Sequence, residues 1–332
     1  MLKSRKTRWM RFGLATIAAG SALLLAACGS PAAKDTGDAS GSGAPKTEKL
    51  KVALITHQAP GDTFWDIVRS GAENAADLNN IELLYSSDPD GARQAQLVQQ
   101  AVDQKVDGIV VTLAKADAMS GEVKKAVDAG IPVFSINAGE EEYKAMGVLA
   151  HFGQNEFIAG QAVGEQLNKE GSKKAVCVIQ EQGHVGLEAR CAGLKDTYKG
   201  ASEILYVNGQ DMTSVASTIT SKLQTNADID FVVTLGAPFA MTAIDAITDA
   251  KSSAKLATTD LNTDVYKALG DGRVVFASDQ QPWLQGYSAV EAVRLYKQGG
   301  YVLGGGQAVL TGPSIINKDN LNTVSAQFED AK

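Results

Sequence analysis

The sequence predicts an α/β protein that contains two doubly wound lobes, each built on a parallel sheet. Short aliphatic runs recur along the chain, and each is followed by a stretch in which apolar residues repeat at helical spacing. Residues 52–55 are entirely apolar, as expected of a strand covered by helices on both faces. The alternation restarts near Lys173, and repeated βαβ units of this kind form parallel sheets. A chain of 332 residues, 44% of them hydrophobic, is long enough for two such cores.

The first 27 residues predict an export signal that is not part of the fold. A basic head precedes an uncharged run of apolar and small residues at 12–27. The end of this run, Leu25-Ala26-Ala27-Cys28, resembles the lipobox of bacterial lipoproteins, which implies that Cys28 is lipidated and becomes the mature N-terminus. The alternative is a simple transmembrane anchor, for which the apolar run is short. We therefore assign residues 1–27 to a lipoprotein signal peptide.

Charge and composition narrow the possible partners. The formal net charge is −7, and removal of the five basic residues of the signal would leave −12. That balance argues against a nucleic-acid partner and against electrostatic docking on anionic lipid. Residues 28–49 are poor in apolar side chains and rich in Gly, Ser, Ala and Asp, so they predict a flexible tether. The folded part is expected to begin at Leu50.

The stretch at residues 51–65 organises the first lobe. Its apolar strand stops before His57, Pro60 and Gly61 mark a loop, and Asp62 is placed to cap the helix that follows. Ligands of open α/β sheets lie at the carboxyl ends of strands, so residues 57–65 are expected to line a site. Further strands are expected at 81–85, 106–113, 131–137, 147–152, 176–179, 204–207, 231–235, 256–259 and 274–277.

Two cysteines remain beyond Cys28, and we expect them to form a disulfide. Cys177 lies in a predicted strand and Cys191 in the helix that follows. In an exported protein such a leftover pair is more often bonded than free. Closing this loop would stabilise the fold by about 3 kcal/mol in the chain-entropy model. Neither cysteine has a histidine or a second cysteine at metal-ligand spacing, so no metal site is expected.

Three segments give the chain a definite resemblance to a known family. Asp62-Thr63-Phe64-Trp65, the strand at 131–137 and the segment at 183–193 occur in the order found in periplasmic binding proteins of ribose and galactose type, the extracytoplasmic sugar receptors of ABC importers. The resemblance covers residues 50 to about 328. It implies a hinge with three chain crossings, near 151–153, 280–282 and 311–313. The N-terminal lobe would comprise residues 50–151 and 283–311, and the C-terminal lobe residues 152–281 and 312–330.

The resemblance places the aromatic side chains of the site in the loop after the first strand. These are Phe64 and Trp65, with Asp62 beside them as an acceptor for ligand hydroxyls. A sugar or polyol needs flat rings against its C–H faces and rigidly held hydrogen-bonding groups. The alternatives are an ordinary core position for Phe64 and a plain helix cap for Asp62. We expect Trp65→Ala to weaken affinity while melting of the unliganded protein stays nearly unchanged.

Further site residues follow from the same resemblance. Asn137 stands where the family usually has an aspartate, and Arg190 matches a family arginine that would donate a charge-assisted bond to a hydroxyl, unless it is a surface residue of its helix. Asp260 and Gln280 match an acidic residue of the second lobe and an amide at a hinge crossing, with strand-end capping as the alternative for both. Met212 stands where some members have an aromatic residue, and Gly236 stands where many have an asparagine. Both differences argue against ribose itself as the ligand.

The three histidines differ in what the sequence implies for them. His57 follows the first strand, and ligand contact and a structural role stay equally open for it. His151 is expected to be structural. His184 is expected at a loop or helix start, with a smaller chance of reaching the cleft. No pair of histidines has metal-ligand spacing.

The predicted function is capture of a monosaccharide or sugar alcohol between the lobes and its delivery to an ABC transporter permease. No phosphate-binding loop, G-x-S-x-G or H-E-x-x-H motif is present, so we expect neither an enzyme nor a cofactor. The alternatives are a nucleoside or signal-molecule receptor of the same fold and, less favoured, a glycoside hydrolase that uses Asp62 and Asp260. We expect an extracytoplasmic monomer, attached to the cell membrane through its N-terminal lipid anchor.

Overall fold

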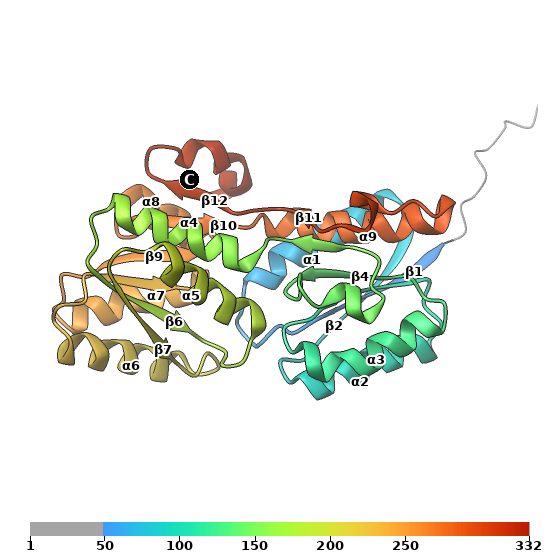
Figure 1. The fold of residues 1–332 in the computed structure, drawn as a ribbon. Coiled ribbons are helices and arrows are strands. Elements are labelled where there is room, and N and C mark those ends of the chain that lie inside the picture. Colours follow the sequence, from blue (N-terminus) through green and yellow to red (C-terminus); the bar gives the residue numbers. More distant parts are fainter. Residues whose placement is uncertain (1–48, 332) are drawn as a thin grey trace, which may run out of the picture. The chain divides into compact units, whose positions relative to one another are not determined.

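Residues 49–331 are described by the computed structural model, and they form two six-stranded sheets with helices on both faces (Figure 1). The strands of the first sheet are β1 (Leu50–Thr56), β2 (Ile81–Ser87), β3 (Gly108–Thr112), β4 (Val133–Asn137), β5 (His151–Gly153) and β11 (Val309–Leu310). The helical segments on it are α1 (Phe64–Leu78), α2 (Gly91–Asp103), α3 (Ala116–Asp128) and α9 (Pro282–Gly299), with the short 3-10 turns η1 (Tyr143–Met146) and η2 (Leu303–Gly306). The strand order is β11-β5-β4-β3-β1-β2, and all neighbours are parallel.

The second sheet repeats this topology. Its strands are β6 (Lys174–Ile179), β7 (Ala201–Tyr206), β8 (Phe231–Thr234), β9 (Lys255–Thr259), β10 (Phe276–Asp279) and β12 (Ser314–Asn317). Its helical segments are α4 (Glu156–Lys169), α5 (Val185–Thr197), α6 (Met212–Thr225), α7 (Ala237–Asp249), α8 (Thr263–Asp271) and η3 (Leu321–Ala331). The order is β12-β10-β9-β8-β6-β7, parallel except for the β10–β12 pair. The prediction of two doubly wound lobes is confirmed.

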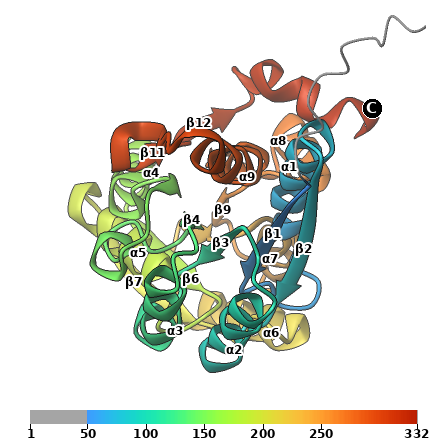
Figure 2. The same cartoon turned by 90° about the vertical axis from the view of Figure 1, so that its right-hand side faces the viewer.

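Each sheet separates two hydrophobic layers. In the first sheet, Leu54 and Val110 pack with α1 and α9, whereas Ile55 and Val111 on the opposite face pack with α2 and α3. Figure 2 shows these two pairs of helices on opposite sides of the sheet. Neighbouring residues of a strand point to opposite faces, so a strand covered on both sides is a continuous apolar run. The second sheet has α4 and α5 on one face and α6, α7 and α8 on the other.

One pair of helices in each lobe crosses with the backbones in contact. A Cβ added at Gly71 of α1 would lie 2.0 Å from a carbonyl oxygen of α9, and one at Gly286 of α9 would lie 1.9 Å from a carbonyl oxygen of α1. Gly160 of α4 and Gly193 of α5 approach each other's helices equally closely. Any side chain at these four positions would push the helices apart, so the close crossing requires glycine.

The chain passes between the two lobes three times. It leaves the first sheet after β5, returns to it through α9 after β10, and crosses again between β11 and β12. A hinge with three crossings is therefore present, at the places in the chain where the family resemblance implies it. The residue bounds that we assign to each lobe stay a prediction.

Some local features differ from the sequence-based expectation. The strand expected at 147–152 begins only at His151, because Gly147 ends η1 in the left-handed region with a φ of 79°. Asp62 is not the N-cap residue of α1, since Thr63 holds that position. The Asp62 carboxylate instead accepts a hydrogen bond from the backbone N–H of Phe64 at 3.1 Å, so it still satisfies a donor of the first turn.

The predictions for the N-terminal segment fall almost entirely on residues that the structure does not describe. These are the signal peptide, lipidation at Cys28 and the tether as far as residue 48. Within residues 49–331, none of the helices combines the length and the apolar character that crossing a bilayer requires.

Candidate ligand-binding site

A cavity of about 460 Å³ lies between the carboxyl ends of the strands of the two sheets. Loops of both lobes line it, including those that follow β1, β3 and β4 on one side and β6, β8 and β9 on the other. These strand ends are where open α/β sheets bind ligands. The predicted ligand-binding residues all line this cavity: His57, Asp62, Phe64, Trp65, Asn137, Arg190, Met212, Gly236, Asp260 and Gln280. Their contact with a ligand stays a prediction.

A chain of hydrogen bonds joins the two lobes beside the hinge. The Asn137 side-chain amide donates to Oε1 of Gln280 at 3.1 Å, and Nε2 of Gln280 donates to the Asp260 carboxylate at 2.7 Å. Asn137 ends β4, Asp260 follows β9, and Gln280 follows β10 at the second crossing. Asn137 and Asp260 have positive φ angles of 64° and 71°, a region that asparagine and aspartate enter more readily than most residues. At both strand ends, therefore, a residue with left-handed backbone conformation, Asn137 or Asp260, directs its polar side chain to Gln280 at the hinge.

Three rings form the aromatic wall of the cavity. The Trp65 ring lies 4.9 Å from that of Phe64 and 4.7 Å from that of His57 between centroids, both in edge-to-face geometry. Trp65 is 2% exposed, and it packs with Phe64 in the core under α1. The two rings therefore belong to the core and to the cavity at once. The burial contradicts our expectation that Trp65→Ala spares stability, because truncating a buried tryptophan typically costs about 3–5 kcal/mol.

Arg190 reaches the cavity as one half of a buried ion pair. Its Nε and Nη2 donate to the two carboxylate oxygens of Glu156, the second bond at 2.9 Å. Both side chains are buried, so the surface alternative for Arg190 is wrong, and Glu156 is a residue that the sequence reasoning missed. A two-pronged pair fixes the plane of the guanidinium, which holds its other N–H groups in defined directions.

Two carboxyl groups of the cavity titrate near neutral pH. Burial raises the pKa of Asp62 to about 6, although the hydrogen bond from the Phe64 backbone opposes this shift. Burial likewise raises the pKa of Asp260 to about 7, against the positive charge of Arg190 and the hydrogen bond from Gln280. A ligand hydroxyl that donates to either oxygen would favour the ionised form.

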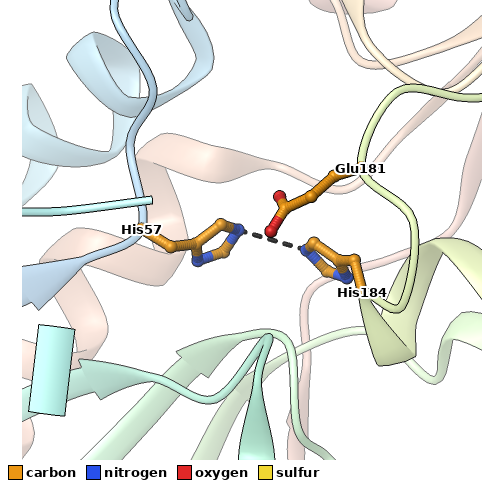
Figure 3. A group of neighbouring side chains, drawn as sticks. All are labelled: His57, Glu181 and His184. Atoms are coloured by element: carbon orange, nitrogen blue, oxygen red, sulfur yellow. Dashed lines mark hydrogen bonds between the residues drawn. The ribbon is translucent and has the colours of Figure 1, made fainter. Parts of the chain in front are cut away.

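Two histidines meet across the cavity (Figure 3). Nε2 of His57, which follows β1, lies 3.1 Å from Nε2 of His184, which follows β6 and is the N-cap of α5. The Glu181 side chain lies next to this pair. His184 therefore occupies the expected helix start and also reaches the cavity. His151 is fully buried, its ring lies 3.0 Å from the Ser135 hydroxyl, and it does not line the cavity, as expected of a structural residue.

The loops after β3 and β6 also touch each other directly. The Lys115 ammonium lies 3.2 Å from the Glu181 carboxylate and donates to the backbone oxygen of Gln182 at 2.9 Å. The backbone N–H of Val185 donates to the backbone oxygen of Ala114 at 3.2 Å. The structure therefore has the two lobes in contact along this side of the cavity.

Several lining residues are absent from the sequence-based site. Lys115 follows β3, Gln180 and Glu181 follow β6, and Phe239 lies in the first turn of α7 after β8. Each of them comes soon after a strand. The strand-end rule, applied to every predicted strand rather than to the segments of the family resemblance, would have found them.

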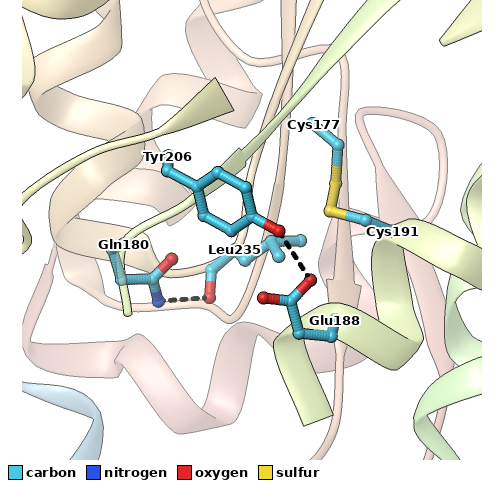
Figure 4. Close-up of a disulfide and its surroundings, with 6 residues drawn as sticks. All are labelled: Cys177, Gln180, Glu188, Cys191, Tyr206 and Leu235. Carbon is cyan, nitrogen blue, oxygen red and sulfur yellow. Dashed lines mark hydrogen bonds between the residues drawn. A yellow bond between two sulfur atoms is a disulfide. The ribbon is translucent and has the colours of Figure 1, made fainter. Parts of the chain in front are cut away.

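A disulfide joins Cys177 of β6 to Cys191 of α5, as predicted (Figure 4). It connects the strand and the helix on either side of the loop at 180–184, which carries Glu181 and His184. The Tyr206 hydroxyl donates to the Glu188 carboxylate at 3.0 Å and adds a second link from α5 to the sheet. The loop that meets the other lobe is thus held at both of its ends.

Two lobes that are connected by a three-crossing hinge and have a cavity of mixed polar and apolar lining between them are typical of proteins that bind a small ligand by closing on it. The comparison with known families agrees with this class. The family model described as periplasmic binding protein domain matches residues 52–300. The chain belongs to this family.

The chain is also similar to individual sugar-binding proteins. A carbohydrate transporter from Acidothermus cellulolyticus 11B, whose crystal structure was solved in complex with myo-inositol, is 49% identical with a TM-score of 0.84, covering 86% of this chain and 99% of that one. The fructose import binding protein FruE of Bifidobacterium longum is 26% identical over 86% of this chain and 89% of its own length. The xylose/arabinose-binding protein XylF of Sulfolobus acidocaldarius is 25% identical over 76% and 67%. These relatives are described as sugar-binding or carbohydrate transport proteins and not as enzymes, which argues against the glycoside hydrolase alternative.

Proposed function

We propose that this protein captures a cyclic polyol in the cavity between its lobes, with myo-inositol as the first candidate, and delivers it to an ABC permease. The observation that carries the proposal is the 49% identity to the Acidothermus protein, whose structure holds myo-inositol. Contacts from both lobes to one ligand would favour the closed arrangement. The closed surface is then what a permease recognises.

The chemistry of the cavity suits a neutral polyol. Every hydroxyl of such a ligand both donates and accepts hydrogen bonds. The cavity offers carboxyl acceptors at Asp62 and Asp260 and donors at Arg190 and Asn137. Trp65 adds apolar ring surface for the C–H bonds of the ligand. A ring that carries a hydroxyl on each carbon can engage all of these groups at once.

The test is titration calorimetry with a panel of candidates on protein that has been unfolded and refolded to remove any carried ligand. The panel contains myo-inositol, D-xylose, D-fructose, D-ribose, xylitol and adenosine. We expect one site per chain and the tightest binding for myo-inositol, with the largest increase in melting temperature for the same compound. Tighter binding of D-xylose or D-fructose, the ligand class named for the relatives, would overturn the assignment to a cyclitol. Binding of adenosine alone would overturn the sugar and polyol class.

We further propose that Cys28 carries a lipid and that the mature protein is a monomer anchored on the extracytoplasmic side of the membrane. The lipobox-like Leu25-Ala26-Ala27-Cys28 supports the anchor. In an expression host with lipoprotein processing, the wild type should fractionate with membranes and its N-terminal peptide should carry acyl mass at Cys28. The Cys28→Ala variant should lack this mass, and acylation that persists in the variant would contradict the proposal.

A further inference from the structure

The histidine pair that bridges the cavity has its protons fixed by its other contacts. Nδ1 of His184 accepts from the backbone N–H groups of Gly186 at 3.1 Å and Leu187 at 3.4 Å, as the N-cap of α5. An imidazole nitrogen that accepts carries no proton, so neutral His184 carries its proton on Nε2. This Nε2–H therefore donates to Nε2 of His57 across 3.1 Å.

His57 is held in the complementary form. Since its Nε2 accepts, its proton is on Nδ1, which donates to the Thr112 hydroxyl oxygen at 2.7 Å. The same oxygen accepts from Nε2 of Gln94 at 2.8 Å. All four side chains are buried. The result is a chain of hydrogen bonds with one direction, which runs from α5 of one lobe to β3 of the other.

The same proton positions argue against a metal site. His57, Glu181 and His184 each offer one ligand atom within 4.8 Å, a geometry compatible with a divalent cation. A metal-bound histidine normally donates its second N–H to an acceptor, but Nδ1 of His184 faces two N–H donors. In addition, the Lys115 ammonium is 3.2 Å from the Glu181 carboxylate and would repel a second cation. The arrangement instead fits two neutral histidines joined by one hydrogen bond, which His184 donates to His57.

We propose that the His57–His184 hydrogen bond is a proton-sensitive clasp, which holds the lobes together while both rings are neutral and releases them when His57 is protonated. The proposal rests on the proposed function, because closure is the step that captures the ligand. The bond exists only when the lobes meet, since each ring comes from a different lobe. Protonated His57 would turn an N–H toward the N–H of His184, so the bond would be lost.

The groups around the pair oppose a positive charge on His57. Lys115 at the start of α3 and Arg190 of α5 act on His57 from opposite lobes. Burial and these two cations lower the pKa of His57 to about 3. Burial, His57 and the same cations place the pKa of His184 well below its ordinary value.

The negative groups near the pair are already engaged. Glu181, in the loop before α5, is paired with Lys115, and Glu156 of α4 is paired with Arg190. Asp62, in the loop after β1, has a pKa of about 6. Protonation of Asp62 near pH 6 removes a negative charge in the pH range in which His57 of an open form would gain a positive one.

The sign of the pH effect follows from the two states of the hinge. In an open form Nε2 of His57 would face water, with a pKa near the ordinary value of about 6.5. A group whose pKa falls on closing favours closure when it is deprotonated, so acid opposes closure from about pH 6.5 down to about pH 3. One such histidine lowers the equilibrium constant for closure about tenfold between pH 7.5 and pH 5.5, and ligand affinity falls by up to the same factor. His184 adds little, because its cap on α5 persists in the open lobe and keeps Nδ1 unprotonated.

The experiment compares myo-inositol affinity by calorimetry at pH 7.5, 6.5 and 5.5 in the wild type and two variants. His57→Gln keeps an acceptor within reach of His184 and does not titrate in this range. His184→Asn keeps a good N-cap for α5 and lacks the Nε2–H donor. Asp62 and Asp260 titrate in all three proteins, so the difference between the profiles isolates the clasp. D-xylose replaces myo-inositol as the probe if the ligand panel favours the monosaccharide.

We expect the affinity of the wild type to fall more than that of His57→Gln over this pH range, by a factor of up to about ten. His184→Asn should bind about two- to tenfold more weakly than the wild type at pH 7.5, where the clasp is intact. Identical pH profiles for the wild type and His57→Gln would overturn the clasp even if the ligand binds tightly. Stoichiometric Zn²⁺ binding at pH 7.5 that is lost in both variants would overturn the proton assignment.

A measurement without ligand separates this proposal from the proposed function. Should no probe bind, small-angle scattering of the ligand-free proteins decides the question. Expansion of the wild type, but not of His57→Gln, between pH 7.5 and pH 5.5 would support the clasp. Equal scattering profiles of the two proteins at both pH values would refute it.

Discussion

Replacement of both members of the Arg190–Glu156 pair should weaken ligand binding more than it weakens the fold. Arg190 uses two of the five N–H groups of a guanidinium on Glu156, and its side chain also lines the cavity. A charge-assisted bond from it to a ligand hydroxyl would contribute about 1.5–3 kcal/mol. Its loss therefore corresponds to roughly a 10- to 150-fold weaker affinity.

The double variant, which loses both members of the ion pair, should be more stable than the single variant, which loses only one. Glu156→Gln leaves a buried guanidinium without its counter-charge, which should lower the free energy of unfolding by about 3–5 kcal/mol. The double variant Glu156→Leu with Arg190→Met removes both charges and should regain most of that loss, because a buried pair is often replaceable by apolar side chains.

Urea unfolding and calorimetry with myo-inositol measure the two effects separately. The reasoning is refuted if the double variant binds as tightly as the wild type, since Arg190 would then serve the fold alone. It is also refuted if the double variant is no more stable than Glu156→Gln, because the loss would not come from the unpaired charge.

Three further predictions follow from the packing. Cys177→Ala with Cys191→Ala should lower the free energy of unfolding, measured by urea unfolding, by about 3 kcal/mol for a sequence separation of 14. The reduced wild type is the matched control, and unchanged stability would contradict the view that the disulfide stabilises by restricting the unfolded chain. Trp65→Ala should lower both myo-inositol affinity and, by about 3–5 kcal/mol, the stability of the unliganded protein; an unchanged melting temperature would show that its burial does not support the fold. Gly193→Ala should destabilise the fold by about 1–3 kcal/mol or more, because the added Cβ lies 1.9 Å from a carbonyl oxygen of α4. The control Gly121→Ala in α3 meets nothing within 4 Å and should stabilise the fold by about 0.5–1 kcal/mol. Equal effects of the two glycine changes in thermal unfolding would mean that α4 and α5 separate at no cost.

The architecture could be predicted from the periodicity of apolar residues, because local patterns determine where strands and helices form. The apolar run at 52–55 reads as a strand covered on both faces, and it lies between two hydrophobic layers. The positions of Asn137 and Asp260 at strand ends likewise follow from counting strands and helices along the chain. A doubly wound sheet brings such ends together whatever the intervening helices contain.

The side-chain pairs within the site could not be predicted from the sequence, because they join residues that are far apart along the chain. Arg190 meets Glu156 across 34 residues, and His184 meets His57 across 127. No local pattern marks such partners. Trp65 shows a second reason: a residue in the first turn of a helix at a strand end can face the core and the cavity together, and periodicity records only the core.

The backbone contact between α1 and α9 has a mechanical consequence. Because Gly71 and Gly286 bring the two backbones into contact, bending of the hinge would move α1 and α9 together as one unit. Gln281 precedes α9 at the second crossing with a φ of 55°, and α1 carries Trp65 in its first turn. A methyl group at Gly71 would push α1 away from α9, and we expect this to displace the Trp65 ring at the cavity although Gly71 itself does not line it.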